Sequence, residues 1–139
     1  MKPMPKRVRI LFVCIGNSCR SPIAEAIARH TAADVIDASS AGIAPLGYIA
    51  DGTRKVLLER GIPIDGQFSK GMNDDNIQHP VDLLINMTGR PGARLFSKMN
   101  CEDWLVEDPY GEDMETYRRI CHDIEARVND LATRLRNSK

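Results

Sequence analysis

The sequence predicts an α/β fold in which helices cover both faces of a parallel sheet. Apolar runs typical of buried strands alternate along the chain with segments of helical periodicity, which is the pattern of strand–helix–strand units. The length of 139 residues is that of one domain, and a chain of this size can bury a core without a metal or a disulfide. The last segment carries a single apolar stripe, which indicates a long helix packed on one side.

The first elements are a strand, a tight loop and a helix. Residues 8–13 form a continuous apolar run that ends before Gly16, which indicates a buried parallel strand running into a loop. Ser21 and Pro22 then predict a helix start, with Ser21 as the N-cap and proline at the first helical position. A second strand is expected at residues 35–39.

The second half of the chain continues this alternation. Residues 53–60 predict a helix that Gly61 can close in the left-handed conformation, residues 81–87 indicate another buried strand, and residues 90–99 a short helix. A heptad stripe such as the last one also occurs in coiled coils, but one copy in a small α/β chain favours docking on the sheet. The residues of this stripe are Met114, Tyr117, Cys121, Ile124, Val128, Leu131 and Leu135.

Net charge and hydropathy exclude two classes of partner. Nineteen Lys and Arg side chains balance nineteen Asp and Glu side chains, which excludes the broadly basic surface of a non-specific nucleic-acid binder. No apolar run approaches the roughly 18 residues of a membrane span. The basic N-terminal segment resembles a signal peptide, but its apolar stretch is too short and no small-residue cleavage site follows. We therefore expect a cytoplasmic protein with reduced cysteines.

The segment from Cys14 to Pro22 is the part of the sequence that carries chemistry. It joins the end of a strand to the start of a helix, where backbone N–H groups lack partners and the helix dipole is positive. Gly16 and Asn17 readily adopt positive φ, so successive N–H groups can point inward around an anion. Arg20 supplies a planar fork for two oxygens, and the same donors favour the thiolate of Cys14. This combination indicates phosphoryl-group or analogous oxyanion chemistry.

This loop, Cys-x-Gly-Asn-x-Cys-Arg-Ser-Pro, resembles the active-site loop of the low-molecular-weight protein tyrosine phosphatase family, which includes arsenate reductases and arginine phosphatases. The resemblance covers most of the chain, with further matches at Ser39-Ser40-Ala41-Gly42, Arg60-Gly61-Ile62, Asp82 to Met87 and Glu107-Asp108-Pro109-Tyr110. It implies a single phosphatase-like domain over residues 1–139. It also implies a three-layer fold on a four-stranded parallel sheet, with no cofactor and no metal.

The resemblance further implies a role for each matching residue. Cys14 corresponds to the nucleophile, Arg20 to the phosphate clamp and Asp108 to the general acid, which later serves as the base that activates water. Ser21 corresponds to the residue that stabilises the thiolate. The phosphate would be bound by the whole loop, which consists of Ile15, Gly16, Asn17, Ser18, Cys19, Arg20 and Ser21.

Three supporting roles follow from the same resemblance. Asn17 and Ser40 would hold the loop in its strained conformation. Cys19 would form a reversible disulfide with Cys14 that protects the nucleophile from over-oxidation, and a thiol reductant is then an expected partner. The other expected partner is a phosphorylated protein or peptide, and neither a nucleic acid nor a membrane is expected.

The acidic surroundings of Asp108 support a proton donor on physical grounds. Glu107, Glu112 and Asp113, together with an arriving phosphate dianion, disfavour a further negative charge nearby. A carboxyl group there is therefore more readily protonated when substrate is bound, as a general acid requires. Glu112, Asp113 and Glu115 themselves are interpreted as solvated acids at a helix N-terminus, where the dipole favours them.

The residues expected around the pocket differ from the pattern common in this family, so they do not identify the substrate. Ser18 stands where tyrosine phosphatases of this type often carry Ile, arginine phosphatases Thr and the reductases Ser. Gly111 follows Asp-Pro-Tyr where a second aromatic residue is common, which resembles the arginine phosphatases and weakens the aromatic wall at Tyr110. Leu46 and Tyr48 lie where the opposite wall is expected; Tyr48 would partly compensate, or both would simply pack.

The cysteines bear on the remaining alternatives. Arsenate reduction in this family needs two further thiols just after the strand at residues 81–87, but Thr88-Gly89-Arg90-Pro91 stands there and Cys101 lies well downstream. A four-cysteine zinc site is not expected, because neither cysteine pair has the usual two-residue spacing. The sequence therefore favours a phosphatase acting on phosphotyrosine in proteins, with phosphoarginine and then arsenate as alternatives. A non-catalytic phosphate-binding module is least favoured, because binding alone requires neither Cys14 nor Asp108.

Overall fold

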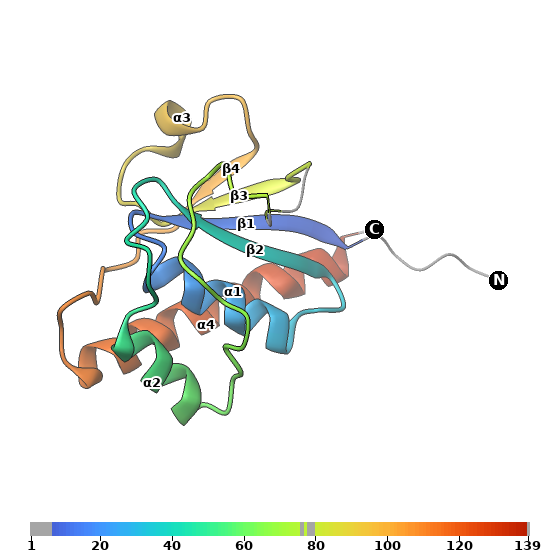
Figure 1. Ribbon diagram of the computed structural model, residues 1–139. Helices are drawn as coiled ribbons and strands as arrows, with labels where there is room; N and C mark the ends of the chain where they lie inside the picture. The colour runs from blue at the N-terminus through green and yellow to red at the C-terminus, as the bar shows by residue number, and fades with distance from the viewer. Residues whose placement is uncertain (1–6, 76, 78–79, 139) are drawn as a thin grey trace.

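In the computed structural model, which describes residues 7–75, 77 and 80–138, four strands form one parallel sheet (Figure 1). Residues 1–6 and 139, which belong to the predicted domain, lie outside the described part. The spatial order is β2-β1-β3-β4, and each neighbouring pair is parallel. The strands are β1 (Val8–Cys14), β2 (Ile36–Gly42), β3 (Leu83–Asn86) and β4 (Cys101–Asp103). The sheet predicted from the resemblance is therefore confirmed.

The central strand β1 ends at Cys14, where the loop that leads to the first helix begins. Its residues from Ile10 to Cys14 are buried, because β2 and β3 flank the strand and both sheet faces are covered. Since all four strands run the same way, their C-terminal ends lie at one edge of the sheet, where loops of α/β proteins commonly form binding sites. Cys14 is the last residue of β1 at this edge.

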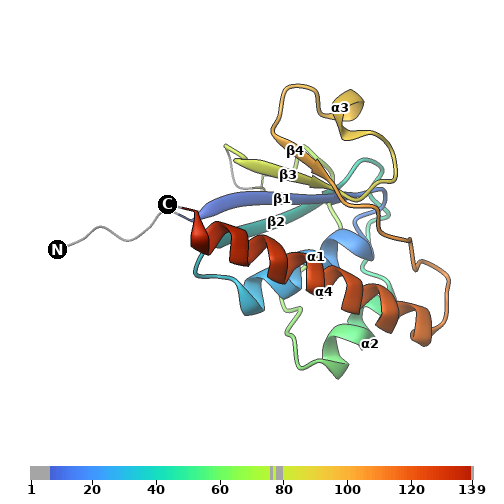
Figure 2. The ribbon, with the colours of Figure 1, turned by 180° about the vertical axis from the view of Figure 1, so that it is seen from behind.

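Helices lie on both sides of the sheet (Figures 1 and 2). On one side α1 (Arg20–Thr31), α2 (Asp51–Glu59) and α4 (Met114–Asn137) cover the larger core, in which the ring of Phe12 from β1 packs against Trp104. The short α3 (Gly92–Leu95) lies on the other side (Figure 1). The smaller core there consists of Leu11, Val13, Ala41, Ile77, Leu84 and Phe96.

The long C-terminal helix follows its predicted stripe. Asp113 is its N-cap and accepts a hydrogen bond from the backbone N–H of Thr116 at 3.0 Å. The helix packs beside α1 and α2, within the larger core, rather than forming a separate coiled coil. Its buried residues are Tyr117, Ile120, Cys121, Ile124, Val128, Leu131 and Ala132. In the described part of the chain, no helix has the length and apolarity needed to cross a membrane.

Several predicted boundaries need correction. Helix α1 begins at Arg20, so the predicted N-cap role of Ser21 is wrong, and Ser21 lies inside the first turn. The helix expected at residues 90–99 is only the single turn of α3, and the strand β4 was not predicted as an element. Strand β4 has three residues with no apolar alternation, so its position depends on pairing with β3. Gly61 adopts positive φ (69°) just after α2, as predicted.

Candidate active site

The loop between β1 and α1 is held open from outside. Its carbonyl groups accept hydrogen bonds from backbone amides of the segment that follows β2, so they point away from the centre of the loop. The pairs are Ile43 N to Cys14 O (3.2 Å), Ala44 N to Ile15 O (2.9 Å), Leu46 N to Gly16 O (2.9 Å) and Ala50 N to Ser18 O (3.2 Å). Because each peptide group has its N–H opposite its C=O, this arrangement turns the loop amides inward.

The backbone amides of residues 15–19 donate to no protein acceptor within the described chain. Asn17 has a positive φ of 47°, as predicted, and this conformation closes the loop, whereas Gly16, for which positive φ was also expected, does not adopt it. The loop then enters the N-terminus of α1, which adds the positive end of a helix dipole. Successive free N–H groups beside such a helix end form a binding site suited to a tetrahedral oxyanion.

A buried hydrogen-bond network connects Cys14 to the loop. The sulfur of Cys14 lies 3.0 Å from the hydroxyl of Ser21, and the amide of Asn17 donates to Ser21 at 2.8 Å and to Ser40 at 3.0 Å. The Asn17 carbonyl oxygen accepts from the backbone N–H of Lys70 at 2.9 Å. Asn17, Ser21 and Ser40, the residues predicted to support the loop and the sulfur, are thus joined through the side-chain amide of Asn17.

This network ends in a buried charge cluster that sequence reasoning missed. The hydroxyl of Ser40 donates to the carboxylate of Glu25, whose side chain is 2% exposed. Two cations balance this carboxylate, because the ammonium of Lys70 lies 3.6 Å from it and the guanidinium of Arg29 2.9 Å. A buried carboxylate requires such partners, so these contacts stabilise the network from behind. A charged residue on an otherwise apolar helix face was the available signal.

Arg20 is fixed by contacts with distant parts of the chain. One of its terminal nitrogens donates to the carbonyl of Met87 at 2.7 Å and to that of Val106 at 3.2 Å. The other terminal nitrogen lies 3.6 Å from a carboxylate oxygen of Asp108. The Nε atom is buried and has no hydrogen-bond partner among the residues that the structure describes. These contacts fix the side chain, and its Nε–H group is available to donate a hydrogen bond to a ligand.

Cys14, Arg20 and Asp108 meet around one cavity of about 190 Å³, although they come from the end of β1, the start of α1 and the segment before α4. The Asp108 side chain is 52% exposed, and one of its oxygens accepts the backbone N–H of Tyr110 at 3.1 Å. The cavity is lined by Cys14, Ile15, Gly16, Ser18, Cys19, Arg20, Leu46, Asp108 and Tyr110. A thiol, a guanidinium group and a carboxyl group therefore face one space.

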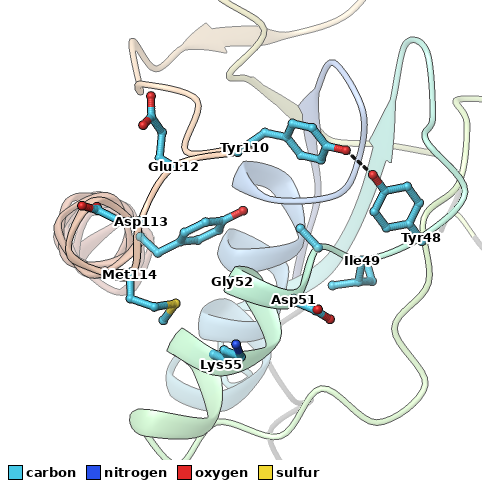
Figure 3. A pocket seen from close by; sticks show the side chains of 12 residues that line it. Tyr48, Ile49, Asp51, Gly52, Lys55, Tyr110, Glu112, Asp113 and Met114 are labelled. Carbon is cyan, nitrogen blue, oxygen red and sulfur yellow. Dashed lines mark hydrogen bonds between the residues drawn. The ribbon is translucent and has the colours of Figure 1, made fainter.

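Of the three residues expected at the walls of the pocket, Tyr110, Leu46 and Tyr48, two line this cavity. Tyr110 lines the cavity, as expected, and Leu46 forms the wall near Gly16. Tyr48 does not line this cavity, and its hydroxyl instead contacts the hydroxyl of Tyr110 (Figure 3). The chain turns between Leu46 and Tyr48 at Gly47, whose φ is 88°, and this turn separates the two side chains. A compensating role of Tyr48 stays a prediction.

A family model described as "Low molecular weight phosphotyrosine protein phosphatase" matches residues 9–139. The chain belongs to this family. The resemblance predicted from the motifs is thereby confirmed.

Named members of the family that are similar to this chain differ in activity. A "Glutaredoxin arsenate reductase" of Synechocystis sp. is 30% identical over 131 residues, which cover 91% of this chain and 98% of the relative. A "Protein-arginine-phosphatase" of Geobacillus stearothermophilus is 28% identical over 150 residues, covering 94% and 98%. The solved structure of a low molecular weight protein tyrosine phosphatase from T. tengcongensis has a TM-score of 0.80 and 27% identity, covering 92% of this chain and 99% of that one.

The cysteines of this family member have unequal environments. Cys19 borders the cavity, and its sulfur lies 3.3 Å from the hydroxyl of Tyr117. Burial raises the pKa of the Cys19 thiol, so Cys19 is favoured as a neutral thiol. Burial also raises the pKa of Cys121, to about 11, and Cys101 lies away from the cavity on β4. The disulfide between Cys14 and Cys19 stays a prediction.

Ser69 is a second contributor that the sequence analysis missed. Its hydroxyl donates to the carbonyl of Gly16 and accepts the backbone N–H of Gly47, each at 3.1 Å. One side chain thus connects the loop between β1 and α1 to the segment that carries Leu46. Neither partner is close in sequence, and no motif marks a serine in this position.

Replacing Ser69 by alanine is expected to lower kcat/KM for p-nitrophenyl phosphate by up to about 30-fold, because two hydrogen bonds worth about 1 kcal/mol each are lost at the loop. Ser69→Thr retains the hydroxyl and should restore most of the activity. Steady-state kinetics and urea unfolding of both variants separate an effect on the loop from a general loss of stability. An alanine variant as active as the parent would exclude this role.

Proposed function

We propose that this protein hydrolyses phosphomonoesters through a cysteinyl-phosphate intermediate and that its substrate is phosphotyrosine in proteins. The observation that carries the proposal is the meeting of Cys14, Arg20 and Asp108 around one cavity of about 190 Å³. The three residues are far apart in sequence or lie on different elements, so their meeting is a property of the whole fold. A binding module would need the loop and Arg20 but neither the thiol nor the carboxyl group.

In the first step, the sulfur of Cys14 attacks phosphorus and the bond to the ester oxygen breaks. The loop amides and Arg20 stabilise the negative charge on the other phosphoryl oxygens, since preorganised donors act strongly in such a site. Asp108 gives its proton to the leaving oxygen, which departs as an alcohol or phenol. The products of this step are the free hydroxyl compound, the cysteinyl-phosphate and a carboxylate at Asp108.

In the second step, the Asp108 carboxylate removes a proton from water, and the oxygen of that water attacks phosphorus. The sulfur–phosphorus bond breaks, inorganic phosphate is released and Cys14 leaves as a thiolate. The hydroxyl of Ser21, 3.0 Å from the sulfur, stabilises this thiolate by donating a hydrogen bond. The cycle involves no change of redox state and returns the enzyme to its starting form.

The cavity walls support an aromatic substrate. Leu46 and Tyr110 flank the entrance with apolar surface, which suits the ring of phosphotyrosine better than a charged group. A phosphorylated protein is the partner that this chemistry implies. Because Cys14 must stay reduced to act, we place the protein in a reducing compartment such as the cytoplasm.

Phosphoarginine is the second candidate, and Ser18 is the observation that favours it. The Ser18 hydroxyl lines the cavity, is buried, and has no hydrogen-bond partner in the described part of the chain. A buried hydroxyl gains about 1–3 kcal/mol when it finds a partner. It can accept from the N–H next to the phosphorus of phosphoarginine, whereas toward the ester oxygen of phosphotyrosine, which bears no hydrogen, it can only donate.

Arsenate is the third substrate to compare, because Cys19 borders the same cavity as Cys14 and a relative is named as an arsenate reductase. Against it, Cys121 is buried in the core and Cys101 lies on β4, so neither offers a thiol at the cavity.

Parallel turnover measurements on a phosphotyrosine peptide, a phosphoarginine peptide and arsenate with a thiol reductant test the proposal. We expect kcat/KM to be highest for the phosphotyrosine peptide. A higher value for phosphoarginine would select the second candidate, and reduction of arsenate with no phosphatase activity would overturn the hydrolase. Phosphate binding without turnover of any substrate would indicate a binding module.

Replacing Asp108 by asparagine is expected to lower kcat by about 10²–10⁴ for phosphotyrosine, because a poor leaving group needs the proton. The loss should be smaller for p-nitrophenyl phosphate, whose leaving group is stable as an anion. A series of aryl phosphates with graded leaving groups measures this difference.

Glu107→Gln is the matched control, because Glu107 is the neighbouring acid and its carboxylate is paired with Arg119 at 2.7 Å. This variant should retain the parent's dependence on the leaving group. An equal loss across the whole series in Asp108→Asn would show that Asp108 acts structurally rather than as a proton donor.

A further inference from the structure

A second, larger cavity of about 530 Å³ lies beside the one that holds Cys14. It opens between the first turns of α2 and the segment that leads into α4 (Figure 3). Tyr110 lines both cavities, so the two spaces are adjacent. We call the second space the outer cavity; its charged and aromatic lining residues are Tyr48, Asp51, Lys55, Tyr110, Glu112, Asp113 and Tyr117.

The outer cavity has a defined wall and floor. Tyr48 and Tyr110 are joined by their hydroxyls on one side, and their side chains remain 49% and 47% exposed (Figure 3). Tyr117 forms the partition, because it lines the outer cavity while its hydroxyl bonds Cys19, which lines the inner one. Gly52 allows this close packing, since a Cβ there would lie 2.3 Å from the Tyr117 ring. Exposed aromatic surface beside an active site indicates a contact surface for a ligand.

The charges around the outer cavity favour a cationic ligand. The residues that line it carry three carboxylates and one ammonium group, which leaves two negative charges in excess. In Figure 3 the carboxylates of Glu112 and Asp113 lie on the side away from Tyr48. Asp113 is reliably ionised, because its hydrogen bonds to Thr116 hold the pKa of its carboxyl below the usual range. Neither Asp51 nor Glu112 forms an ion pair with any residue that the structure describes.

Two acids of the neighbouring segments that do not line the cavity form ion pairs. Glu59, at the other end of α2, pairs with Arg118 at 2.7 Å, and Glu107 pairs with Arg119 at the same distance. Both arginines belong to α4, which contributes no basic residue to the outer cavity. Two carboxylates without an ion pair in the described part of the chain, those of Asp51 and Glu112, thus belong to the same cavity as the exposed tyrosine rings. An arginine or lysine side chain matches both features, because its cation is attracted by carboxylates and by the faces of tyrosine rings.

We infer that the outer cavity is a subsite for a lysine or arginine side chain that lies next to the phosphorylated residue of a protein substrate. The inference rests on the proposed function, which places the phosphorylated residue in the inner cavity. Because the two cavities are adjacent at Tyr110, a neighbouring residue of the same peptide can reach the outer cavity. A small phosphate ester fills the inner cavity alone and does not sense these charges at close range.

Phosphotyrosine peptides that carry lysine, alanine or glutamate at each flanking position test this inference. We expect kcat/KM to be about two- to fivefold higher with lysine than with alanine at the preferred position, and lower with glutamate, as solvent-exposed ion pairs allow. The preference should decrease as salt is added, because salt screens exposed charges. The rate with p-nitrophenyl phosphate provides the reference for the chemistry itself.

Two variants with opposite charge changes sharpen the test. Glu112→Gln should reduce the lysine preference, and Lys55→Gln should increase it, each measured relative to p-nitrophenyl phosphate. Glu115→Gln is the matched control, because Glu115 is an exposed acid of α4 that does not line the outer cavity. It should leave the preference and the reference rate unchanged.

The outcomes separate the subsite from the proposed function. Turnover of phosphotyrosine peptides with the same flanking preference in all variants would overturn the subsite alone. An equal effect of Glu115→Gln and Glu112→Gln would also overturn it, since the preference would then reflect the general field of the loop. A protein that turns over neither p-nitrophenyl phosphate nor any peptide would overturn the proposed function together with the subsite.

Discussion

Replacing Cys14 by serine is expected to lower kcat for p-nitrophenyl phosphate by on the order of 10⁶, the loss typical of removing the nucleophile from a covalent catalyst. A serine hydroxyl is far less nucleophilic than a thiolate, and Asp108, the carboxyl group at the cavity, is the proposed proton donor in the first step, so it does not activate the serine. The loop amides and Arg20 do not depend on the sulfur, because they are held by residues 43–50 and by the carbonyls of Met87 and Val106. Anion binding should therefore survive.

Steady-state kinetics and calorimetric titration with inorganic phosphate measure the two properties separately. The variant should bind phosphate within a few-fold of the parent while showing no turnover above background. Cys101→Ser is the control, because Cys101 lies on β4 and does not border the cavity. A Cys14→Ser variant that still hydrolyses the ester at a substantial rate would show that another group is the nucleophile.

Replacing Arg20 by lysine is expected to reduce kcat/KM by about 10²–10³, the typical loss when a preorganised oxyanion donor is removed. Lysine retains the charge but lacks the planar fork that contacts the carbonyls of Met87 and Val106 and still presents Nε. A single ammonium group cannot donate hydrogen bonds to both carbonyls and to the substrate in the geometry that the guanidinium group allows. Both phosphate affinity and kcat should therefore decrease.

Arg119→Lys is the matched control for this experiment. Arg119 also pairs with an acid of the loop before α4, but its side chain is 59% exposed and its partner is Glu107. Exposed pairs contribute little, so this variant should behave like the parent. If Arg20→Lys hydrolysed p-nitrophenyl phosphate within a few-fold of the parent, Arg20 would not be the phosphate clamp.

The oxyanion loop was predictable because its determinants are local. The loop depends on the end of β1 at Cys14, the positive φ of Asn17 and the start of α1 at Arg20. These features are neighbours in the sequence. The periodicity of α4 is local in the same sense, and its buried face follows the predicted stripe. One local prediction, the N-cap at Ser21, was wrong because the hydroxyl is engaged by Cys14 and Asn17.

The tertiary structure decided which distant groups meet. The sequence shows no reason why Ser69 should bond Gly16, or why Glu25 should end the network behind Ser40. It also left the position of Tyr48 open and did not reveal that Tyr117 separates two neighbouring cavities. Such contacts depend on how α4, α2 and the segment after β2 pack over the sheet. Local patterns specify backbone conformation and side-chain chemistry, whereas the walls, partners and charge balance of a cavity arise only when segments far apart in the chain come together.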